Sequence, residues 1–319
     1  MELRRLGSSD ILVPPLCFGG NVFGWTADEA TSLRLLDGLF EAGFTFIDTA
    51  DVYSRWASGN QGGESETIIG KWMKARGNRE KIVLATKVGS DMGLGKRCLK
   101  PDYVRTAIEA SLKRLQTDYV DLYFSHWDDP ETPFEDVLAT YDELIKAGKV
   151  RLIGASNLTA SRLFDALAVS AREGLPRYEV VQPEYNLYAR EGYEAEIEPI
   201  CQRNGLGVVA YYALAAGFLT GKYRTPADAA ASVRGEDVVK TYLNPRGLRI
   251  LAALDEVAAA HGASPAQVAL AWIMARPSLT APIASASRVE QLADLFAAAS
   301  LTLAPADMAR LDAASAATA

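Results

Sequence analysis

The segment Gly43–Tyr53 reads GFTFIDTADVY and decides how the rest of the chain is interpreted. It starts as a short apolar strand over residues 45–49 and continues into a polar turn that closes with Tyr53. Two later apolar runs also end in ionisable side chains, the first in Lys87 and the second in His126. Strands buried on both faces carry few ionisable groups, so three consecutive strands with polar ends predict one shared polar site.

Short strands rich in β-branched residues alternate with helices along the chain. Strands are predicted over residues 16–20, 45–49, 81–87, 119–126, 150–156, 178–185, 206–212 and 280–285. Helices are predicted over residues 28–42, 64–75, 101–115, 133–147, 160–173, 192–203, 245–260, 264–275 and 288–298. Eight such units predict an α/β protein, and their nearly even spacing favours a closed (β/α)8 TIM barrel over a doubly wound sheet.

Three segments lie outside this repeat. Residues 1–15 are predicted to form a hairpin with a Gly-Ser-Ser-Asp turn that plugs one end of the barrel. Residues 217–242 form a long loop between the seventh and eighth strands, followed by the additional helix 245–260, and an Ala-rich tail follows Pro305. Long loops in compact domains are usually functional. All 319 residues are expected to form a single domain.

The composition limits the partners of the protein. A net charge of −7 argues against nucleic acid or an anionic membrane as the partner. The N-terminus lacks a signal-peptide pattern and no apolar run reaches the roughly 18 residues of a membrane helix, so a cytoplasmic protein is expected, as a monomer or homo-oligomer. The cysteines Cys17, Cys98 and Cys201 are too far apart in sequence to outline a disulfide framework or a zinc site, and no metal is expected.

The barrel interpretation brings the polar strand ends to one mouth, because barrel active sites form at the carboxyl ends of the strands. We expect Asp48 to keep Lys87 charged, and the ammonium to lower the pKa of the Tyr53 hydroxyl from about 10 toward neutrality. A tyrosine of this kind can give or take a proton, and a neutral His126 can orient a carbonyl oxygen. The set favours carbonyl reduction, or alcohol oxidation, by hydride transfer.

These motifs resemble the aldo-keto reductases over almost the whole chain, including bacterial members and the branch with potassium-channel β-subunit-like reductases. The resemblance rests on Gly43–Tyr53, on the run LATK at Leu84–Lys87 and on DLYFSHW at Asp121–Trp127. It implies reversible reduction of an aldehyde or ketone, such as a sugar, an aromatic or a small carbonyl compound. The implied catalytic residues are Asp48, Tyr53, Lys87 and His126, with Tyr53 as the general acid/base.

The resemblance further implies NADPH/NADP+ as the cofactor, held by the loops after strands five to eight. The implied cofactor contacts are Ser156, Asn157, Gln182, Tyr211, Leu214, Gly217, Leu219, Lys222, Ser285, Ser287, Arg288 and Gln291. Gly217–Lys222 resembles the family's pyrophosphate loop, and barrels commonly bind phosphate after strand seven. Two departures from the family pattern keep NADH as an alternative. Tyr211–Leu214 reads YYAL where many relatives have YSPL, and Ser285–Arg288 reads SASR where relatives often have a Gly or Lys and a nearby Arg or Lys for the adenosine 2′-phosphate. Arg288 is the residue that could take this function.

Aromatic residues in the loops at the same mouth are predicted to line the pocket for a small-molecule carbonyl or alcohol substrate: Trp25, Trp56, Trp127 and Tyr212. Two other functions fit the polar strand ends. In the first, Lys87 of a barrel lyase forms a Schiff base with the substrate, although a neighbouring Asp48 argues against an uncharged lysine. In the second, which the resemblance to potassium-channel β subunits implies, the chain is a regulatory subunit that binds the cofactor but turns over slowly.

Overall fold

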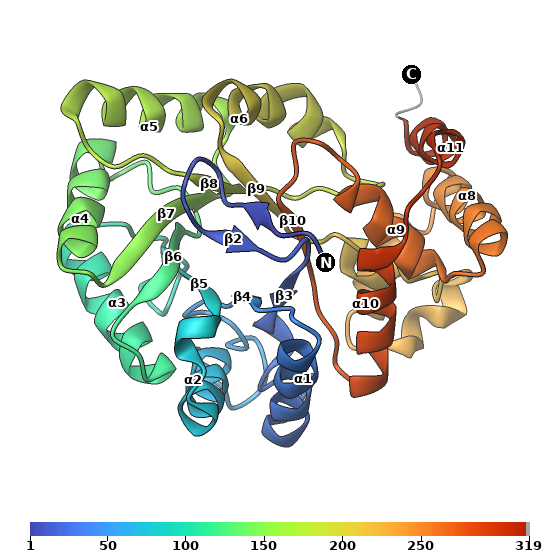
Figure 1. Cartoon of the computed structure of the whole chain (residues 1–319), viewed down its shortest axis with the longest axis horizontal. Helices are drawn as coiled ribbons and strands as arrows, with labels where there is room; N and C mark the ends of the chain where they lie inside the picture. The colour runs from blue at the N-terminus through green and yellow to red at the C-terminus, as the bar shows by residue number, and fades with distance from the viewer. Residues whose placement is uncertain (317–319) are drawn as a thin grey trace.

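The computed structural model describes residues 1–316, and its centre is a closed barrel of eight parallel strands (Figure 1). Neighbouring strands follow chain order, and the last strand pairs with both the seventh and the first, which closes the barrel. The strands are β3 (Cys17–Gly19), β4 (Phe46–Asp48), β5 (Val83–Val88), β6 (Val120–Ser125), β7 (Val150–Ser156), β8 (Val180–Gln182), β9 (Gly207–Ala210) and β10 (Ala281–Ala284). The predicted (β/α)8 barrel is confirmed.

Helices surround the barrel and cover the outer faces of its strands (Figure 1). Their bounds agree with the prediction to within a few residues, because N-cap and C-cap residues such as Asp28 and Gly77 mark the ends in the sequence. Residues 192–203 differ, since they begin as a π-helix over Gly192–Ile197. The helices are α1 (Glu29–Glu41), α2 (Glu64–Arg76), α3 (Pro101–Leu115), α4 (Phe134–Lys146), α5 (Ala160–Glu173), α6 (Glu198–Asn204), α8 (Pro245–His261), α9 (Pro265–Met274) and α10 (Leu292–Ser300).

Two regular segments were not predicted. The loop over residues 217–242 contains the helix α7 (Gly235–Tyr242) as well as short 3-10 turns. The Ala-rich tail contains the helix α11 (Pro305–Ser315), which packs on α8. Each of these helices buries few large apolar side chains, such as Val238 in α7 and Leu311 in α11. α7 spans only 8 residues, which is too short for a repeating pattern, and α11 carries only a weak apolar stripe, so hydrophobic periodicity marks neither helix clearly.

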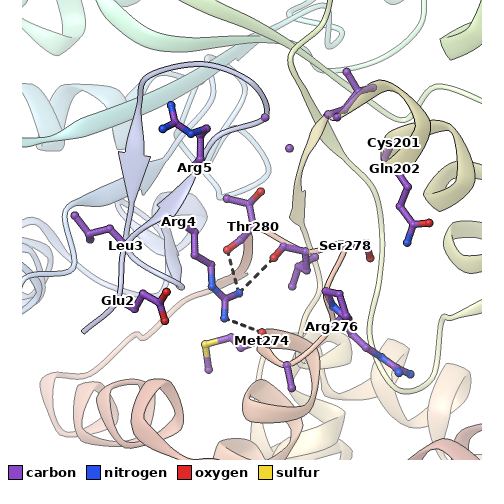
Figure 2. Close-up of a pocket in the computed structure, with 17 residues that line it drawn as sticks. Glu2, Leu3, Arg4, Arg5, Cys201, Gln202, Met274, Arg276, Ser278 and Thr280 are labelled. Carbon is purple, nitrogen blue, oxygen red and sulfur yellow. Dashed lines mark hydrogen bonds between the residues drawn. The ribbon is translucent and has the colours of Figure 1, made fainter.

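The N-terminal hairpin, β1 (Arg4–Arg5) and β2 (Leu12–Val13), lies across the amino-terminal end of the barrel as predicted (Figure 1). Its apolar side chains join the barrel interior in one buried cluster that includes Leu6, Ile11, Val13, Phe46 and Leu122. The Arg4 guanidinium donates to the carbonyl oxygen of Met274 at 2.8 Å and to those of Leu279 and Thr280 at 3.3 Å (Figure 2). This end of the barrel is therefore closed.

A cavity of about 660 Å³ lies beside the hairpin, lined by Arg4, Leu206, Thr280 and their neighbours (Figure 2). These residues lie at the amino ends of the strands, where β9 and β10 begin. The polar strand ends that the sequence singled out lie at the opposite, carboxyl end. The cavity therefore lies at the end of the barrel opposite the expected active site.

Among residues 1–316, none of the helices is by itself long and apolar enough to cross a membrane. The segments Val289–Ser300 and Pro305–Ser315 meet a length and composition test only as a pair, and they are bent by 114° at the break between them. The short apolar helix α9 buries its side chains against α8, α10 and the barrel.

Candidate active site

Lys87 is a completely buried lysine near the end of β5. Its Nζ donates to Asp48 Oδ2 at 2.6 Å, to the Thr49 carbonyl oxygen at 2.9 Å and to the Tyr53 hydroxyl at 2.7 Å. Three acceptors satisfy the three donors of a buried ammonium. The strand register explains the meeting, because Asp48 lies opposite Ala85, and Ala85 and Lys87 project to the same face of β5.

Asp48 connects the lysine to two other groups. Its Oδ2 also accepts from the Tyr53 hydroxyl at 3.0 Å, and its Oδ1 accepts from Gln182 Nε2 at 3.0 Å. Gln182 ends β8 and reaches Asp48 across the barrel interior. The sequence predicted a cofactor contact for Gln182, and nothing in the sequence indicated that its amide would hold this carboxylate. Asp48 therefore has hydrogen-bond partners on both oxygens.

The surroundings of Tyr53 change its acidity in the direction opposite to the prediction. Burial raises the pKa of the Tyr53 hydroxyl well above its usual 10, and the negative charge of Asp48 and its hydrogen bond add to the effect. Burial also lowers the pKa of the Lys87 ammonium, although Asp48 opposes this shift. The prediction of a Tyr53 pKa near neutrality is wrong because it took only the effect of the lysine on the phenolate into account. Desolvation and the neighbouring carboxylate both disfavour the phenolate.

His126 directly follows β6 and faces the same mouth. Its main-chain N–H donates to the Val88 carbonyl oxygen at 2.7 Å, and its Nδ1 lies 3.0 Å from Ser90 Oγ. Burial lowers the pKa of His126 well below 6.5, and the charges of Lys87 and Arg97 add to the effect. The imidazole is therefore neutral, as predicted, and Ser90 fixes the orientation of its ring.

Four of the predicted cofactor contacts form one hydrogen-bonded network. Ser156 Oγ donates to the Gln182 carbonyl oxygen at 2.8 Å, and Asn157 Nδ2 donates to Ser156 Oγ at 3.1 Å and to the His126 carbonyl oxygen at 2.8 Å. The Tyr211 hydroxyl donates to Asn157 Oδ1 at 2.9 Å. The network connects the ends of β6, β7, β8 and β9, and a cavity of about 500 Å³ adjoins it at Asn157 and Gln182.

The chain after β9 adopts an unusual backbone. Ala215, Ala216 and Gly217 have φ values of 48°, 54° and 97°, all in the left-handed region. Within the turn, the N–H groups of Ala215 and Gly217 donate to the carbonyl oxygens of Tyr212 at 2.7 Å and Leu214 at 2.9 Å. A Cβ placed on Gly217 would lie 3.4 Å from Lys222 Nζ, so this lysine adds positive charge beside the turn. Two other predicted cofactor contacts, Leu214 and Leu219, bond to each other in the same loop. Leu219 is completely buried, and its N–H donates to the Leu214 carbonyl oxygen.

The predicted contacts after β10 are held by local hydrogen bonds. Gln291 Oε1 accepts from the main-chain N–H of Ser287 at 2.8 Å and of Arg288 at 3.1 Å, which caps the short helix at Val289. Ser285 Oγ donates to the Gly19 carbonyl oxygen at 2.8 Å. Arg288 has an exposed side chain at this turn. Gln291 therefore has a structural function in shaping the turn that carries Arg288.

Arg234 is a charged residue at the mouth that the sequence analysis missed. Its guanidinium carbon lies 4.6 Å from the ring centroid of Trp25, and burial lowers its pKa. The side-chain amide of Asn21 has one orientation in which both its oxygen and its nitrogen find partners. In that orientation Asn21 Oδ1 accepts from Arg234 at 3.1 Å and Asn21 Nδ2 donates to Ser285 Oγ at 2.7 Å. Its only signal in the sequence was its position in the long loop. Arg234 links that loop to the ends of β3 and β10.

The predicted substrate-pocket tryptophans gather around Tyr53. The ring centroids of Trp25 and Trp56 are 5.6 Å apart, and Trp56 lies 6.0 Å from Tyr53. The Trp127 ring is stacked beside that of His126 at 6.2 Å. Trp56 is 49% exposed, so the aromatic surface is open to solvent next to the buried hydroxyl. Tyr212, the remaining predicted pocket residue, is also exposed.

The barrel carries a buried lysine and a buried carboxylate, in contact with a partly exposed tyrosine, at the carboxyl ends of its strands, and this combination defines a class of barrel enzyme. The chain belongs to the aldo/keto reductase family, whose sequence profile matches residues 15–316. It is therefore an NAD(P)H-dependent oxidoreductase. The resemblance seen in the sequence motifs is confirmed.

Individual relatives support this assignment over nearly their full length. The chain is 37% identical to the uncharacterized oxidoreductase YrpG of Bacillus subtilis (strain 168), over 95% of this chain and 92% of YrpG. It is 32% identical to the aldo-keto reductase yakc [NADP(+)] of Schizosaccharomyces pombe, over 95% and 88% of the two chains. It is also 32% identical to a probable voltage-gated potassium channel subunit beta of Oryza sativa subsp. japonica, over 92% and 90%.

Proposed function

We propose that the protein reduces aldehydes or ketones to alcohols with NADPH and catalyses the reverse oxidation. The main support is the position of the Tyr53 hydroxyl, which lies 2.7 Å from Lys87 Nζ and 3.0 Å from Asp48 Oδ2. A hydroxyl between an ammonium and a carboxylate, at the carboxyl ends of barrel strands, is placed for proton transfer to a substrate in the mouth.

Tyr53 is the proposed general acid. Its raised pKa keeps the proton on the hydroxyl until negative charge develops on the carbonyl oxygen, which then takes that proton. Lys87 stabilises the resulting phenolate, and Asp48 balances the charge of the lysine. The neutral His126 donates an N–H to the carbonyl oxygen and orients the substrate. Bound NADPH supplies the hydride, and thus both electrons, to the carbonyl carbon.

The residues after β9 and β10 fit a nicotinamide dinucleotide. Lys222, which lies beside the left-handed turn at Ala215–Gly217, offers positive charge to the pyrophosphate, and Arg234 over the Trp25 ring is a second positive charge at the mouth. The Tyr211 ring, whose hydroxyl is bonded to Asn157, offers a flat surface for the nicotinamide. The fission-yeast relative is named as an NADP(+) enzyme, which supports NADPH over NADH. Arg288 is the proposed contact for the 2′-phosphate.

We further propose that Trp25, Trp56, Trp127 and Tyr212 bind the non-reacting part of the substrate. Their rings surround the mouth and leave an open aromatic surface, which suits sugars, aromatic aldehydes or small ketones. Location in the cytoplasm, and a monomeric or homo-oligomeric state, are further proposals that follow from the sequence.

The proposed function is tested by titrating the purified protein with NADPH and with NADH, followed by nicotinamide fluorescence. A panel of aldehydes and ketones is then assayed for cofactor oxidation. We expect NADPH to bind more tightly than NADH and at least one carbonyl class to be reduced. Binding of neither cofactor, or binding with no turnover on the whole panel, would contradict the proposal.

The alternative functions predict different outcomes of the same assays. A Schiff-base lyase requires an uncharged Lys87, yet its Nζ is completely buried with three hydrogen-bond acceptors. Borohydride trapping of substrate without any dependence on nicotinamide would favour the lyase. The rice relative is named as a channel subunit, and a cofactor that co-purifies without exchanging or turning over would favour a regulatory function.

A further inference from the structure

Tyr212 has a strained backbone at the position where the chain leaves β9. Its φ is 54°, in the left-handed region that residues other than glycine rarely adopt. The preceding residue is Tyr211, the proposed surface for the nicotinamide. Strained residues of this kind persist only where the surrounding structure holds them. The structure should therefore contain a group that holds Tyr212.

Asn186, which is completely buried in the loop after β8, makes such a contact. Its Oδ1 accepts from the main-chain N–H of Tyr188 at 2.7 Å and of Ala189 at 2.9 Å. Its Nδ2 donates to the carbonyl oxygen of Tyr212 at 3.0 Å. Because two N–H groups face the oxygen and one carbonyl faces the nitrogen, the orientation of the amide is fixed. Asn186 therefore joins the loop after β8 to the strained turn after β9.

Tyr211 is held on the sides that Asn186 does not reach. Its main-chain N–H donates to the Pro183 carbonyl oxygen at 2.9 Å, and its carbonyl oxygen accepts from Tyr185 N–H at 3.3 Å. Its hydroxyl donates to Asn157 Oδ1 at 2.9 Å. These bonds fix both main-chain groups of Tyr211 and the tip of its ring. The next residue, Tyr212, sets the course of the chain from there into the turn at Ala215–Gly217, and its carbonyl oxygen also accepts from the Ala215 N–H at 2.7 Å.

We propose that Asn186 is a positioning residue for the cofactor site. It holds Tyr212 in the left-handed conformation and thereby fixes the path of the chain from Tyr211 into the turn at Ala215–Gly217, without itself touching the cofactor. The inference rests on the proposed function, because it takes Tyr211 and this turn as parts of the cofactor site. Asn186 bonds to the loops after β8 and β9 rather than to the proton-transfer residues, so its loss should weaken cofactor binding.

The first variant is Asn186→Ser. A serine hydroxyl can still accept from the N–H groups of its own turn, but it is too short to reach the Tyr212 carbonyl oxygen. We expect the Kd for NADPH to rise roughly tenfold, while thermal unfolding stays close to that of the wild-type chain. An unchanged Kd would overturn the inference.

The second measurement tests whether the effect passes through Tyr212. In the Asn186→Ser chain, Tyr212→Gly is compared with Tyr212→Ala, since both remove the same ring but only glycine adopts a positive φ without strain. Glycine should restore most of the lost NADPH affinity and alanine should not. A merely structural function for Asn186 predicts no difference between the two, and that result would overturn the inference.

The same pair of substitutions in the otherwise wild-type chain covers the case in which Asn186→Ser fails to fold. There Asn186 still bonds to the carbonyl oxygen of residue 212, so Tyr212→Gly and Tyr212→Ala should bind NADPH with similar affinity. A much weaker affinity of the alanine variant would show that Asn186 does not hold this conformation and would overturn the inference. A wild-type chain that bound neither NADPH nor NADH would overturn the proposed function, and the basis of this inference with it. Normal wild-type binding with no effect of Asn186→Ser would overturn the inference alone.

Discussion

The proton-transfer cluster and the loop after β9 are two parts of one mouth that are held in different ways. In the cluster, the register of β4 and β5 fixes Asp48 and Lys87, and both side chains are buried. In the loop, left-handed backbone at Tyr212 and Ala216 and side-chain bonds from distant segments fix the conformation. Rigid strands suit chemistry that tolerates little displacement, whereas a loop suits binding. Substitutions in the proton-transfer cluster should change kcat, and those in the loop after β9 should change the Kd for the cofactor.

The largest effect is expected for Tyr53→Phe. The variant keeps the aromatic ring but loses the hydroxyl that lies between Lys87 and Asp48. We expect kcat for carbonyl reduction to fall by about 10²-fold or more, the usual scale for a positioned general acid, with the Kd for NADPH near that of the wild type. Stopped-flow and fluorescence titration measure the two quantities. Full activity in this variant would remove Tyr53 from the mechanism.

A smaller effect is expected for Lys222→Met in the loop. The ammonium lies next to Gly217 in the left-handed turn, where it can neutralise a phosphate. The Kd for NADPH should rise roughly tenfold at low salt and by less at high salt, while kcat at saturating cofactor is unchanged. Lys240→Met, an exposed lysine on α7 within the same long segment, is the matched control and should leave the Kd unchanged. A change in kcat without a change in Kd would contradict the assignment of cofactor affinity, rather than rate, to the loop after β9.

The smallest effect is expected for pH. Reduction needs the protonated form of Tyr53, and its pKa is raised well above 10, so this form is present throughout neutral and mildly alkaline pH. His126 stays neutral because its pKa is lowered well below 6.5. We expect kcat/KM for reduction to vary less than about twofold between about pH 6 and about pH 9, whereas alcohol oxidation, which needs the base form, should rise with pH.

The control for this profile is Asp51, a buried carboxyl whose pKa burial raises to about 8, with the charge of Glu66 as a further cause. Any inflection near pH 8 should disappear in Asp51→Asn. An inflection between about pH 6 and about pH 7 that persists in the variant would contradict a neutral His126.

The sequence predicted the cluster well because its information is local. Each strand ends within a residue or two of a polar side chain, and parallel strands put their carboxyl ends at the same edge. Asp48 and Lys87 then fall on the inward face by the two-residue alternation of strands. The structure places Lys87 one residue inside β5 rather than at its end, a difference that leaves the side chain on the same face.

The remaining features depend on contacts between distant segments. Gln182 and Asp48 are 134 residues apart, and Asn186 and Tyr212 are 26 apart, so neither bond appears in a local pattern. The acidity of Tyr53 was predicted with the wrong sign because burial and the charge of Asp48 both raise its pKa, and burial depends on the packing of the whole chain. Arg234 and the 8-residue helix α7 lie in a long segment in which the regular stretch is too short to recognise from the sequence, and tertiary packing positions them.

The division between rate and affinity is tested most directly by single-turnover reduction in the double variant Tyr53→Phe, Lys222→Met. If the two parts act independently, its rate at saturating NADPH should equal that of Tyr53→Phe and its Kd should equal that of Lys222→Met. A Kd that rises further than in Lys222→Met, or a rate well below that of Tyr53→Phe, would contradict the account.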